Sequence, residues 1–421
     1  MDQTEALIIE TIDRHREEIL EFARDIYSHA ELGYKEFQTS GKFVKKMEQL
    51  GLRTEKGFAI TGVKAYLNED KKENASLALL GELDALRIPE HAFANPETNA
   101  AHCCGHHAQM AGIFGAALAL TVPEIAEKLG GQVVFFATPA EEYGEIEFKN
   151  QLREQGKIRY GGGKCELIRT GAFDDIDLCL AHHIQPGDEI QVGSGTGNGF
   201  VSKVIRYLGK AAHAAGAPDK GVNALSAASL GLQALGLNRE TFRDEDCVRV
   251  HPIITKGGNL VNVIPDEIVI ETLVRAKTIE AFTDAAKKTD RSFQAGAVAM
   301  GAKVEITTLP GYLPTLAEQA LPELKRAAEL AAPEVPVREA AGHSGGSTDV
   351  GDVQHLMPVY TFNTGGVKGG LHQINFEVTN EEEAYIDTAK MFALAAYGLL
   401  KEKAARSKEL VKNYKPVFKD S

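Results

Sequence analysis

The fold is indicated most clearly by the stretch Gln132-Val133-Val134-Phe135-Phe136-Ala137-Thr138-Pro139-Ala140-Glu141-Glu142. Its first part is a short, continuous apolar run rich in Val and Phe, which is typical of a strand buried on both faces of a parallel sheet. The run ends in a turn that is followed at once by two adjacent carboxylates. In α/β sheets, ligands bind at the carboxyl ends of the strands, so this stretch predicts functional side chains at such an edge.

On both sides of this stretch, short apolar strands alternate with amphipathic helices. We expect further strands at 62–67, 76–81 and 177–183, and helices at 4–28, 39–50, 107–120 and 164–170. Strands separated by helices form a mostly parallel sheet that helices cover on both faces. The fold class is therefore α/β.

The pattern changes near residue 200. Strands are expected at 201–208, 248–255, 264–274 and 303–309, and helices at 222–237 and 278–300. This β-α-β-β-α-β order matches the ferredoxin-like α+β unit. We therefore expect a main domain made of residues 1–199 and 312–421, in which helical structure resumes at 317–331, and a small inserted domain at 200–311.

The overall composition excludes some classes of protein. The formal charge of −13 over 421 residues, with no basic block, argues against a nucleic-acid partner. No apolar run reaches the ~18 residues of a membrane span, and the N-terminus is acidic, unlike a secretory signal. The five scattered cysteines form no disulfide framework, so we expect a cytoplasmic protein with reduced thiols.

Metal-ligand residue types follow three of the predicted strands and also stand just before the predicted helix at 107–120. At the strand ends they are Glu82 and Asp84, Glu141 and Glu142, and His182 and His183. His102-Cys103-Cys104-Gly105-His106-His107 offers thiolate and imidazole, Glu141-Glu142 offers two carboxylates, and His182-His183 offers two imidazoles. These groups bind a borderline metal such as zinc, and a spare carboxylate beside the metal can act as a general base. The combination predicts metal-assisted hydrolysis.

An ordered set of motifs resembles the M20 metallopeptidase family, and in particular its amidohydrolase branch. The subgroup that it is most similar to contains one of the subunits of aminobenzoyl-glutamate hydrolase and the aminoacylase-1-like dipeptidases. The matching segments span most of the chain in family order: Gly81–Leu86, Cys104-Gly105-His106, Thr138–Glu142, His183–Pro186, Ala212–Ala215, Gly258–Asp266, Gly346–Asp352 and Gly370-Leu371-His372.

The resemblance implies a centre of two divalent ions, zinc or manganese, with cobalt also compatible. The implied ligands are Cys104, His106, Glu142, His183 and His372. It implies Glu141 as the general base. Asp84 stands in Glu82-Leu83-Asp84, where many M20 peptidases have His-x-Asp, and is expected to orient a ligand histidine; a simple turn or N-cap role is the alternative.

Three residues of the inserted domain are also implied. His213 would stabilise the oxyanion in the active site of a partner subunit, which makes the inserted domain a lid and a homodimer interface. Asn262 and Arg275 would hold the carboxylate of a small-molecule amide substrate, since the guanidinium binds carboxylates bidentately. An exposed charge at a strand end is the alternative for Arg275.

Three further residues of the histidine- and cysteine-rich motifs have other roles. Cys103 is expected to be a packed thiol, and His107 to make a hydrogen bond outside the ligand set. Of His182 and His183, we choose His183 as the ligand because Pro186 completes the family's His-x-x-Pro motif.

These observations predict a di-metal amidohydrolase that cleaves an N-acyl or N-aroyl amino acid such as aminobenzoyl-glutamate. A dipeptidase of the same fold, acting on β-alanyl-type dipeptides, is the alternative within the family. From another class, a catalytically silent homologue that binds a small ligand would also share the fold. The sequence identifies neither the acyl group nor the native metal.

Overall fold

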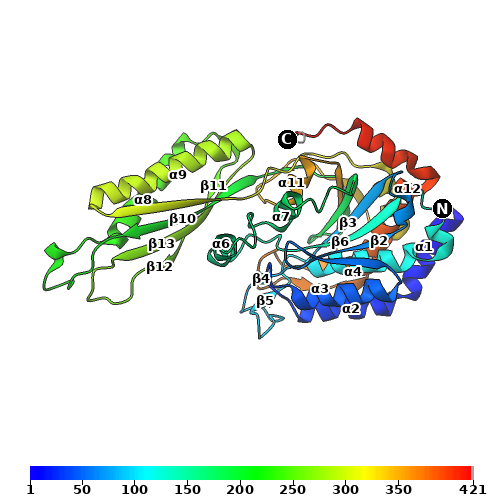
Figure 1. Cartoon of the computed structure of the whole chain (residues 1–421), viewed down its shortest axis with the longest axis horizontal. Coiled ribbons are helices and arrows are strands. Elements are labelled where there is room, and N and C mark those ends of the chain that lie inside the picture. The colour runs from blue at the N-terminus through cyan, green and yellow to red at the C-terminus, as the bar shows by residue number, and fades with distance from the viewer. Residues whose placement is uncertain (419–421) are drawn as a thin grey trace.

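The structure is a computed structural model that describes residues 1–418, and its centre is an eight-stranded sheet. The strands lie in the order β1-β2-β6-β3-β7-β17-β8-β15. Figure 1 labels β2, β6 and β3 of this sheet. The neighbours β6, β3, β7 and β17 are parallel to one another. Their bounds, with those of the outer strands, are β1 Arg53–Phe58, β2 Gly62–Leu67, β3 Ser76–Glu82, β6 Gln132–Thr138, β7 Leu178–Ile184, β8 Ile190–Val192, β15 Val337–Glu339 and β17 Val359–Thr364. The predicted α/β class is confirmed.

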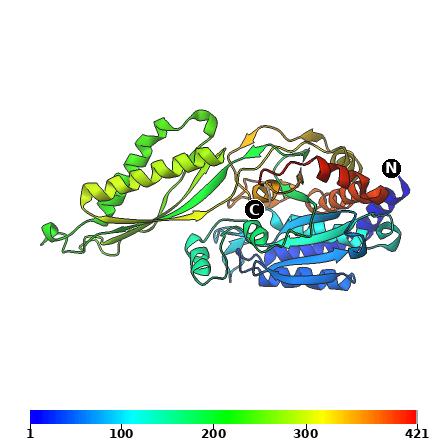
Figure 2. The same cartoon turned by 45° about the horizontal axis from the view of Figure 1, so that its top comes forward.

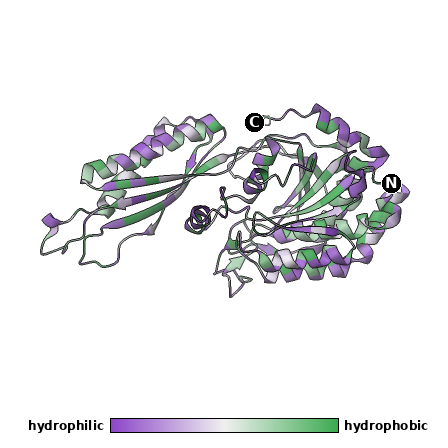
Figure 3. Ribbon diagram, in the orientation of Figure 1, coloured by the Kyte–Doolittle hydropathy of each residue, from purple (hydrophilic) through white to green (hydrophobic). Residues whose placement is uncertain are grey.

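Both faces of this sheet are buried, as the apolar runs predict. Along β6, Val133 and Phe135 belong to one core cluster, whereas Val134 and Phe136 belong to another on the opposite face. Figure 3 shows the result as hydrophobic colour along the central strands. The first core is covered by α1 Gln3–Arg14, α2 Arg16–Ser28, α3 Phe37–Gln49, α4 His106–Leu120, α10 Pro322–Ala331 and α12 Thr388–Asn413, and the second by α6 Ile146–Glu154, α7 Gly163–Arg169 and α11 Val350–Gln354.

Helix α4 is buried along its whole length, which suits its uniformly apolar sequence. It packs between the sheet and α2 and α12. Its N-terminal end therefore lies inside the protein, at the edge of the sheet where the parallel strands end.

A second sheet contains five antiparallel strands, in the order β11-β13-β10-β14 with β12 also paired to β13. Its strands and helices are β10 Gly199–Leu208, α8 Ala224–Asn238, β11 Arg249–Val250, β12 Ile253–Lys256, β13 Glu267–Ala276, α9 Ile279–Met300 and β14 Lys303–Pro310. Both helices pack on one face of the sheet (Figure 2). The predicted ferredoxin-like α+β unit is thus present.

The chain passes from the first sheet to the second and back again, so two segments join the sheets. The backbone N–H of Phe200 donates to the carbonyl oxygen of Tyr312 at 2.9 Å. The rings of these two residues also pack against each other and against Tyr143.

Three predicted elements have different bounds. The expected helix at 4–28 is broken at His15 into α1 and α2, and the expected strand at 248–255 is two short strands. The helix expected from residue 317 begins at Pro322, because proline is favoured in the first turn but cannot continue a helix from the residues before it. None of the helices among the described residues is long and apolar enough to cross a membrane.

Candidate metal centre and active site

The candidate site lies at the carboxyl-terminal edge of the central sheet. Glu141 and Glu142 follow β6 directly, and His183 is the penultimate residue of β7. His106 is the first residue of α4, and His372 comes from the loop after β18 (Val367–Lys368). The topology therefore brings together side chains that are far apart in the sequence.

Gly105 allows Cys104 and His106 to face the same centre. It adopts a left-handed conformation, with φ of +80°, at the N-cap of α4. A Cβ atom at this position would lie 1.9 Å from Cγ2 of Ile184, so no other residue fits without a shift of the neighbouring strand.

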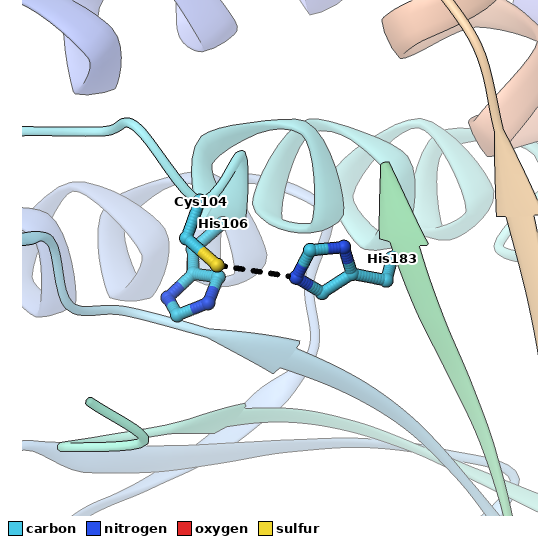
Figure 4. Close-up of side chains that lie close together, drawn as sticks. All are labelled: Cys104, His106 and His183. Atoms are coloured by element: carbon cyan, nitrogen blue, oxygen red, sulfur yellow. Dashed lines mark hydrogen bonds between the residues drawn. The ribbon is translucent and has the colours of Figure 1, made fainter. Parts of the chain in front are cut away.

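The five implied ligands form two overlapping groups. In the first, the Sγ atom of Cys104 lies 3.3 Å from Nε2 of His183, with His106 close by (Figure 4). In the second, Nε2 of His372 lies 3.2 Å from Sγ of Cys104 and 3.2 Å from Oε1 of Glu142. Cys104 belongs to both groups, which is the arrangement expected of a thiolate shared by two ions.

Hydrogen bonds fix the orientation of two of the imidazoles. Nδ1 of His106 lies 2.8 Å from the backbone oxygen of Asp84, and Nδ1 of His183 lies 2.7 Å from that of Ile184. Each Nδ1–H donates to a carbonyl oxygen, so each Nε2 keeps its lone pair for the centre of the site. The carboxylate of Asp84 also accepts the N–H of Glu142 at 2.8 Å, so Asp84 contacts two of the implied ligands.

The residues present fit a pair of divalent ions. Nε2 of His106 and Oε1 of Glu142 are buried and have no hydrogen-bond partner among the described residues. Unpaired polar atoms in a buried position are costly, and both of these point into the ligand groups. The mixture of sulfur, imidazole and carboxylate donors suits zinc, manganese or cobalt.

The carboxyl of Glu141 is buried beside this cluster. Its Oε2 lies 3.9 Å from Nε2 of His106. Burial, together with the Glu82 and Glu142 carboxylates, raises the pKa of Glu141 well above its usual value. Ala140, immediately before it, has a left-handed backbone with φ of +51°, and such strain is concentrated at functional sites.

The same buried environment also shifts the pKa values of two ligand candidates, Glu142 and Cys104. Burial raises the pKa of Glu142, but His372, His106 and Cys104 together more than offset this, so its pKa is lowered. Burial, and then Glu142, raise the pKa of the Cys104 thiol well above its ordinary value. A bound cation would reverse this shift, because a coordinating thiol is deprotonated.

The structure adds Lys164 and Asp349, to which the sequence assigns no chemistry, and joins them to Glu82, which the sequence places among the metal-type ligands at the strand ends. All three are buried. Nζ of Lys164 lies 2.5 Å from Oε1 of Glu82 and 2.7 Å from Oδ1 of Asp349. Glu82 is recognisable as an acidic residue at a strand end, but nothing in the local pattern distinguishes a buried lysine from the surface lysines of other helices.

The additional cysteine and histidines have other partners. Cys103 is fully buried in the first core and belongs to none of the ligand groups. Nε2 of His107 lies 3.1 Å from the hydroxyl of Tyr385, and Nε2 of His182 lies 2.8 Å from the hydroxyl of Thr364.

The structure places the three residues of the second sheet differently. Arg275, in β13, is half-buried, with Nη1 3.5 Å from Oγ of Ser347 and its guanidinium over the ring of Phe200. Burial lowers the pKa of Arg275, and Glu142 and Glu141 act in the opposite direction. His213 and Asn262 lie together in exposed loops, joined by the N–H of Ala214 and the carbonyl of Asn262, and are not members of the ligand groups.

A cavity of about 420 Å³ opens beside the cluster. Glu82 and His183 line one end of it, and Ser347 lies on its wall. Most of the remaining lining residues are small or uncharged, among them Gly193–Gly197, Thr315, Ala340–Ser344 and Thr348.

Comparison with known proteins gives an independent result. Residues 78–397 match the sequence model of "Peptidase family M20/M25/M40". The chain is 27% identical to the Xaa-Arg dipeptidase of Mus musculus, over 97% of this chain and 89% of that protein. It is 26% identical to one of the subunits of the p-aminobenzoyl-glutamate hydrolase of Escherichia coli, over 66% of this chain and 54% of that protein.

A solved structure shares the fold. It is that of a dinuclear metal-binding peptidase of the M20 family from Bacillus subtilis, which superimposes with a TM-score of 0.63 at 23% identity. The superposition covers 92% of this chain and 99% of that one.

Proposed function

The chain belongs to peptidase family M20/M25/M40, whose members are hydrolases, and on that premise we propose that it is a di-metal amidohydrolase of N-acyl amino acids. The observation that carries the proposal is the convergence of Cys104, His106, Glu142, His183 and His372 on one centre beside Glu141. Zinc or manganese ions held there would polarise the amide carbonyl and lower the pKa of a water molecule.

Glu141 is the proposed general base. Its carboxylate takes the proton of the attacking water and later gives it to the leaving amine nitrogen. Its position beside the ligand groups suits this task, because a general base must lie close to the water whose proton it accepts.

Arg275 supports a substrate with a free carboxylate. No carboxylate of residues 1–418 forms an ion pair with its half-buried guanidinium, which approaches Ser347 on the cavity wall. A bound carboxylate would supply the missing counter-charge in a bidentate contact. Asn262 is proposed to assist from the exposed loop next to His213.

His213 is proposed to donate a hydrogen bond to the carbonyl oxygen as it becomes negative. Its Nδ1 accepts the backbone N–H groups of Ala215 and Gly216, at 3.2 and 2.9 Å. The ring proton is therefore on Nε2, which is free to donate. Because His213 is exposed and outside the ligand groups of its own chain, we propose that it acts in a partner subunit.

A homodimer through residues 200–311 follows from this proposal. Among the described residues, the strand β12 pairs only with β13, and its Ile253 and Ile254 are 60% and 44% exposed. Exposed apolar residues on an unpaired strand edge are typical of a pairing surface. The five cysteines are all free thiols, which supports a reducing, cytoplasmic location.

The cavity favours an acyl group over the free N-terminus of a dipeptide. A dipeptide's ammonium group needs an acidic partner, and Glu82, the one carboxylate that lines the cavity among the described residues, is already paired with Lys164. The similarity to the Xaa-Arg dipeptidase keeps a dipeptidase as the second candidate.

Amine release from a panel of substrates tests the proposal. The panel contains aminobenzoyl-glutamate, N-acetyl and N-aroyl amino acids, and β-alanyl dipeptides, each with zinc and with manganese. Cleavage of the acylated substrates alone supports the proposal, and cleavage confined to dipeptides replaces it with the second candidate. A metal-loaded protein that cleaves none of them would favour the silent, ligand-binding homologue.

A further inference from the structure

A carboxylate outside the implied ligand set lies within coordinating distance of the centre. Glu82 ends β3 and is 5% exposed. One oxygen of Glu82, one of Glu141 and a ring nitrogen of His106 all lie within 4.8 Å of one another. His106 is also a member of the group that contains Cys104 and His183, so Glu82 adjoins that group.

The separation between Glu82 and His106 is that of two ligands on one ion. Oε2 of Glu82 lies 3.1 Å from Nε2 of His106. Two ligand atoms at ~2.0–2.2 Å from a tetrahedral ion lie about 3.3 Å apart. Because Nδ1 of His106 donates to the carbonyl of Asp84, the neutral ring, which is the form that binds a metal, carries its lone pair on the Nε2 that faces Glu82. A neutral His106 with this tautomer makes no hydrogen bond to the carboxylate, and an ion between them would satisfy both.

The carboxylate of Glu82 is held rigidly. Its Oε1 accepts Nζ of Lys164 at 2.5 Å, and its Oε2 accepts Nε2 of Gln109 at 2.8 Å. The backbone N–H of Glu82 donates to Oε1 of Gln109 at 2.9 Å, so the two residues are bonded twice. This leaves the carboxylate little freedom to turn away from His106.

Lys164 is itself fixed in place. Its side chain is fully buried, its Nζ contacts Asp349 at 2.7 Å, and its backbone N–H donates to the same carboxylate at 2.7 Å. It follows Gly163, where a Cβ atom would lie 1.6 Å from the carbonyl oxygen of Pro139. Glycine therefore lets α7 approach the turn after β6 closely enough for Lys164 to reach Glu82.

Burying a lysine between two carboxylates is expensive unless the geometry is well satisfied, and replacing such groups by apolar ones is often neutral for stability. The core of this sheet edge thus retains three ionic groups next to the metal centre. Lys164, held by Asp349, keeps one oxygen of Glu82 facing His106 and partly balances the charge of the Glu82 carboxylate.

We propose that Glu82 is an additional protein ligand of the ion that His106 would bind, and that Lys164 is the positioning residue that orients its carboxylate. The proposal rests on the di-metal centre proposed above.

Metal binding by the E82Q variant tests the proposed role of Glu82 directly and requires no turnover. The ions bound per chain are counted by elemental analysis after dialysis, and their affinities are measured by competition with a chelator. We expect the wild-type protein to bind two zinc ions and E82Q to bind one of them at least about ten-fold more weakly. The absorption spectrum of the cobalt-loaded protein should change as well, because the ligand set of one ion changes. E82Q is expected to fold, since Lys164 keeps Asp349 as its counter-ion.

D349N is the matched control, because it also removes one carboxylate from Lys164 but from outside the ligand groups. We expect D349N to keep both affinities within about three-fold and to leave the cobalt spectrum unchanged. Equal losses in E82Q and D349N would overturn the proposal, since the cause would then be the ionic network. Wild-type affinities and spectrum in E82Q would also overturn it. A wild-type protein that binds no ions would instead refute the di-metal centre itself, and so the two failures are distinguishable.

Discussion

The Sγ atom of Cys104 and the Nε2 atom of His183 lie 3.3 Å apart, although 79 positions separate them in the chain. Cys104 precedes a buried helix and His183 is near the end of a buried strand, so neither is free to move independently of the core. The polar centre is therefore built on buried regular elements of the core, as a preorganised site requires.

Replacement of Cys104 by serine is expected to weaken the binding of both ions, because this sulfur belongs to both ligand groups. Elemental analysis after dialysis should find fewer than two ions per chain. C103A is the matched control: the neighbouring thiol is buried in the core, and this variant should retain both ions. Loss of metal in C103A and retention in C104S would reverse the assignment of the two cysteines.

Replacement of Glu141 by glutamine should leave the metal content unchanged and lower kcat by about 10²–10⁴, the usual contribution of a general base. The amide has the size of the carboxyl but does not accept a proton. Steady-state kinetics on a substrate found in the panel, with the metal content measured in parallel, checks this. Turnover within about two-fold of the wild type would remove Glu141 from this role.

Replacement of Arg275 by methionine should raise KM for substrates with a carboxylate by about 10–100-fold, since a hydrogen bond to a charged group contributes ~1.5–3 kcal/mol. The corresponding substrate with a carboxamide in place of the carboxylate is the control. Its KM should be nearly the same for both proteins. A similar loss for the two substrates would show that Arg275 acts through the fold of the strand rather than through the carboxylate.

Mixing two inactive variants tests whether His213 acts in the partner subunit. H213A and E141Q are each expected to be nearly inactive. In a mixed dimer, one site combines an intact Glu141 with an intact His213, so subunit exchange should restore about a quarter of the wild-type activity. If His213 acts in its own chain, mixing restores no activity. Sedimentation of each variant confirms that both still dimerise.

The buried carboxyl of Asp387, which is not one of the candidate active-site residues, makes the stability of the folded protein depend on pH. Burial raises the pKa of Asp387 to about 7, against the smaller opposing effect of Lys390. The folded state thus holds a proton that the unfolded state has lost between the ordinary aspartate pKa of 3.8 and about 7, so the stability of the protein falls as the pH rises through this window. D387N removes this loss: it should be more stable than the wild type at pH 8, by a few kcal/mol at most, and no more stable below pH 4. Thermal melts of both proteins at both pH values measure this difference in stability. If the fold stabilised Asp387 as an anion, D387N would instead be less stable than the wild type at pH 8.

The sequence predicts much of this fold because its apolar runs are short, continuous and well separated. The strand ending at Thr138 and the helix ending at Leu120 have nearly the expected bounds, since both are buried on all sides. The short strands β8 and β15, the last two at one end of the sheet, are not predicted. Each has only three residues, and its position depends on pairing with distant strands rather than on its own composition.

The residues of the candidate site can be predicted from the sequence where they belong to short motifs, and not elsewhere. Cys104 and His106 stand two positions apart, so their convergence follows from local structure. The network around Lys164 joins β3, α7 and the start of α11, which are linked only by tertiary packing. Local sequence patterns hold no information on which lysine such packing will bury. The roles assigned to Glu141, His213 and Arg275 stay predictions until the variants are measured.

The two segments that join the sheets have a consequence for substrate affinity. The carbonyl of Tyr312 accepts a hydrogen bond from Phe200, and the hydroxyl of Tyr312 donates a hydrogen bond to the backbone carbonyl of Glu141. The segments that join the two sheets are therefore hydrogen-bonded to the backbone of the proposed base. A substrate that contacts Arg275 on one sheet and Glu141 on the other must hold the two sheets at a fixed angle. To the extent that the free protein samples other angles, part of the binding free energy is consumed in selecting the bound one. A dissociation constant would then understate the strength of the contacts themselves, and a substitution that holds the two sheets at the bound angle would tighten binding without touching the substrate.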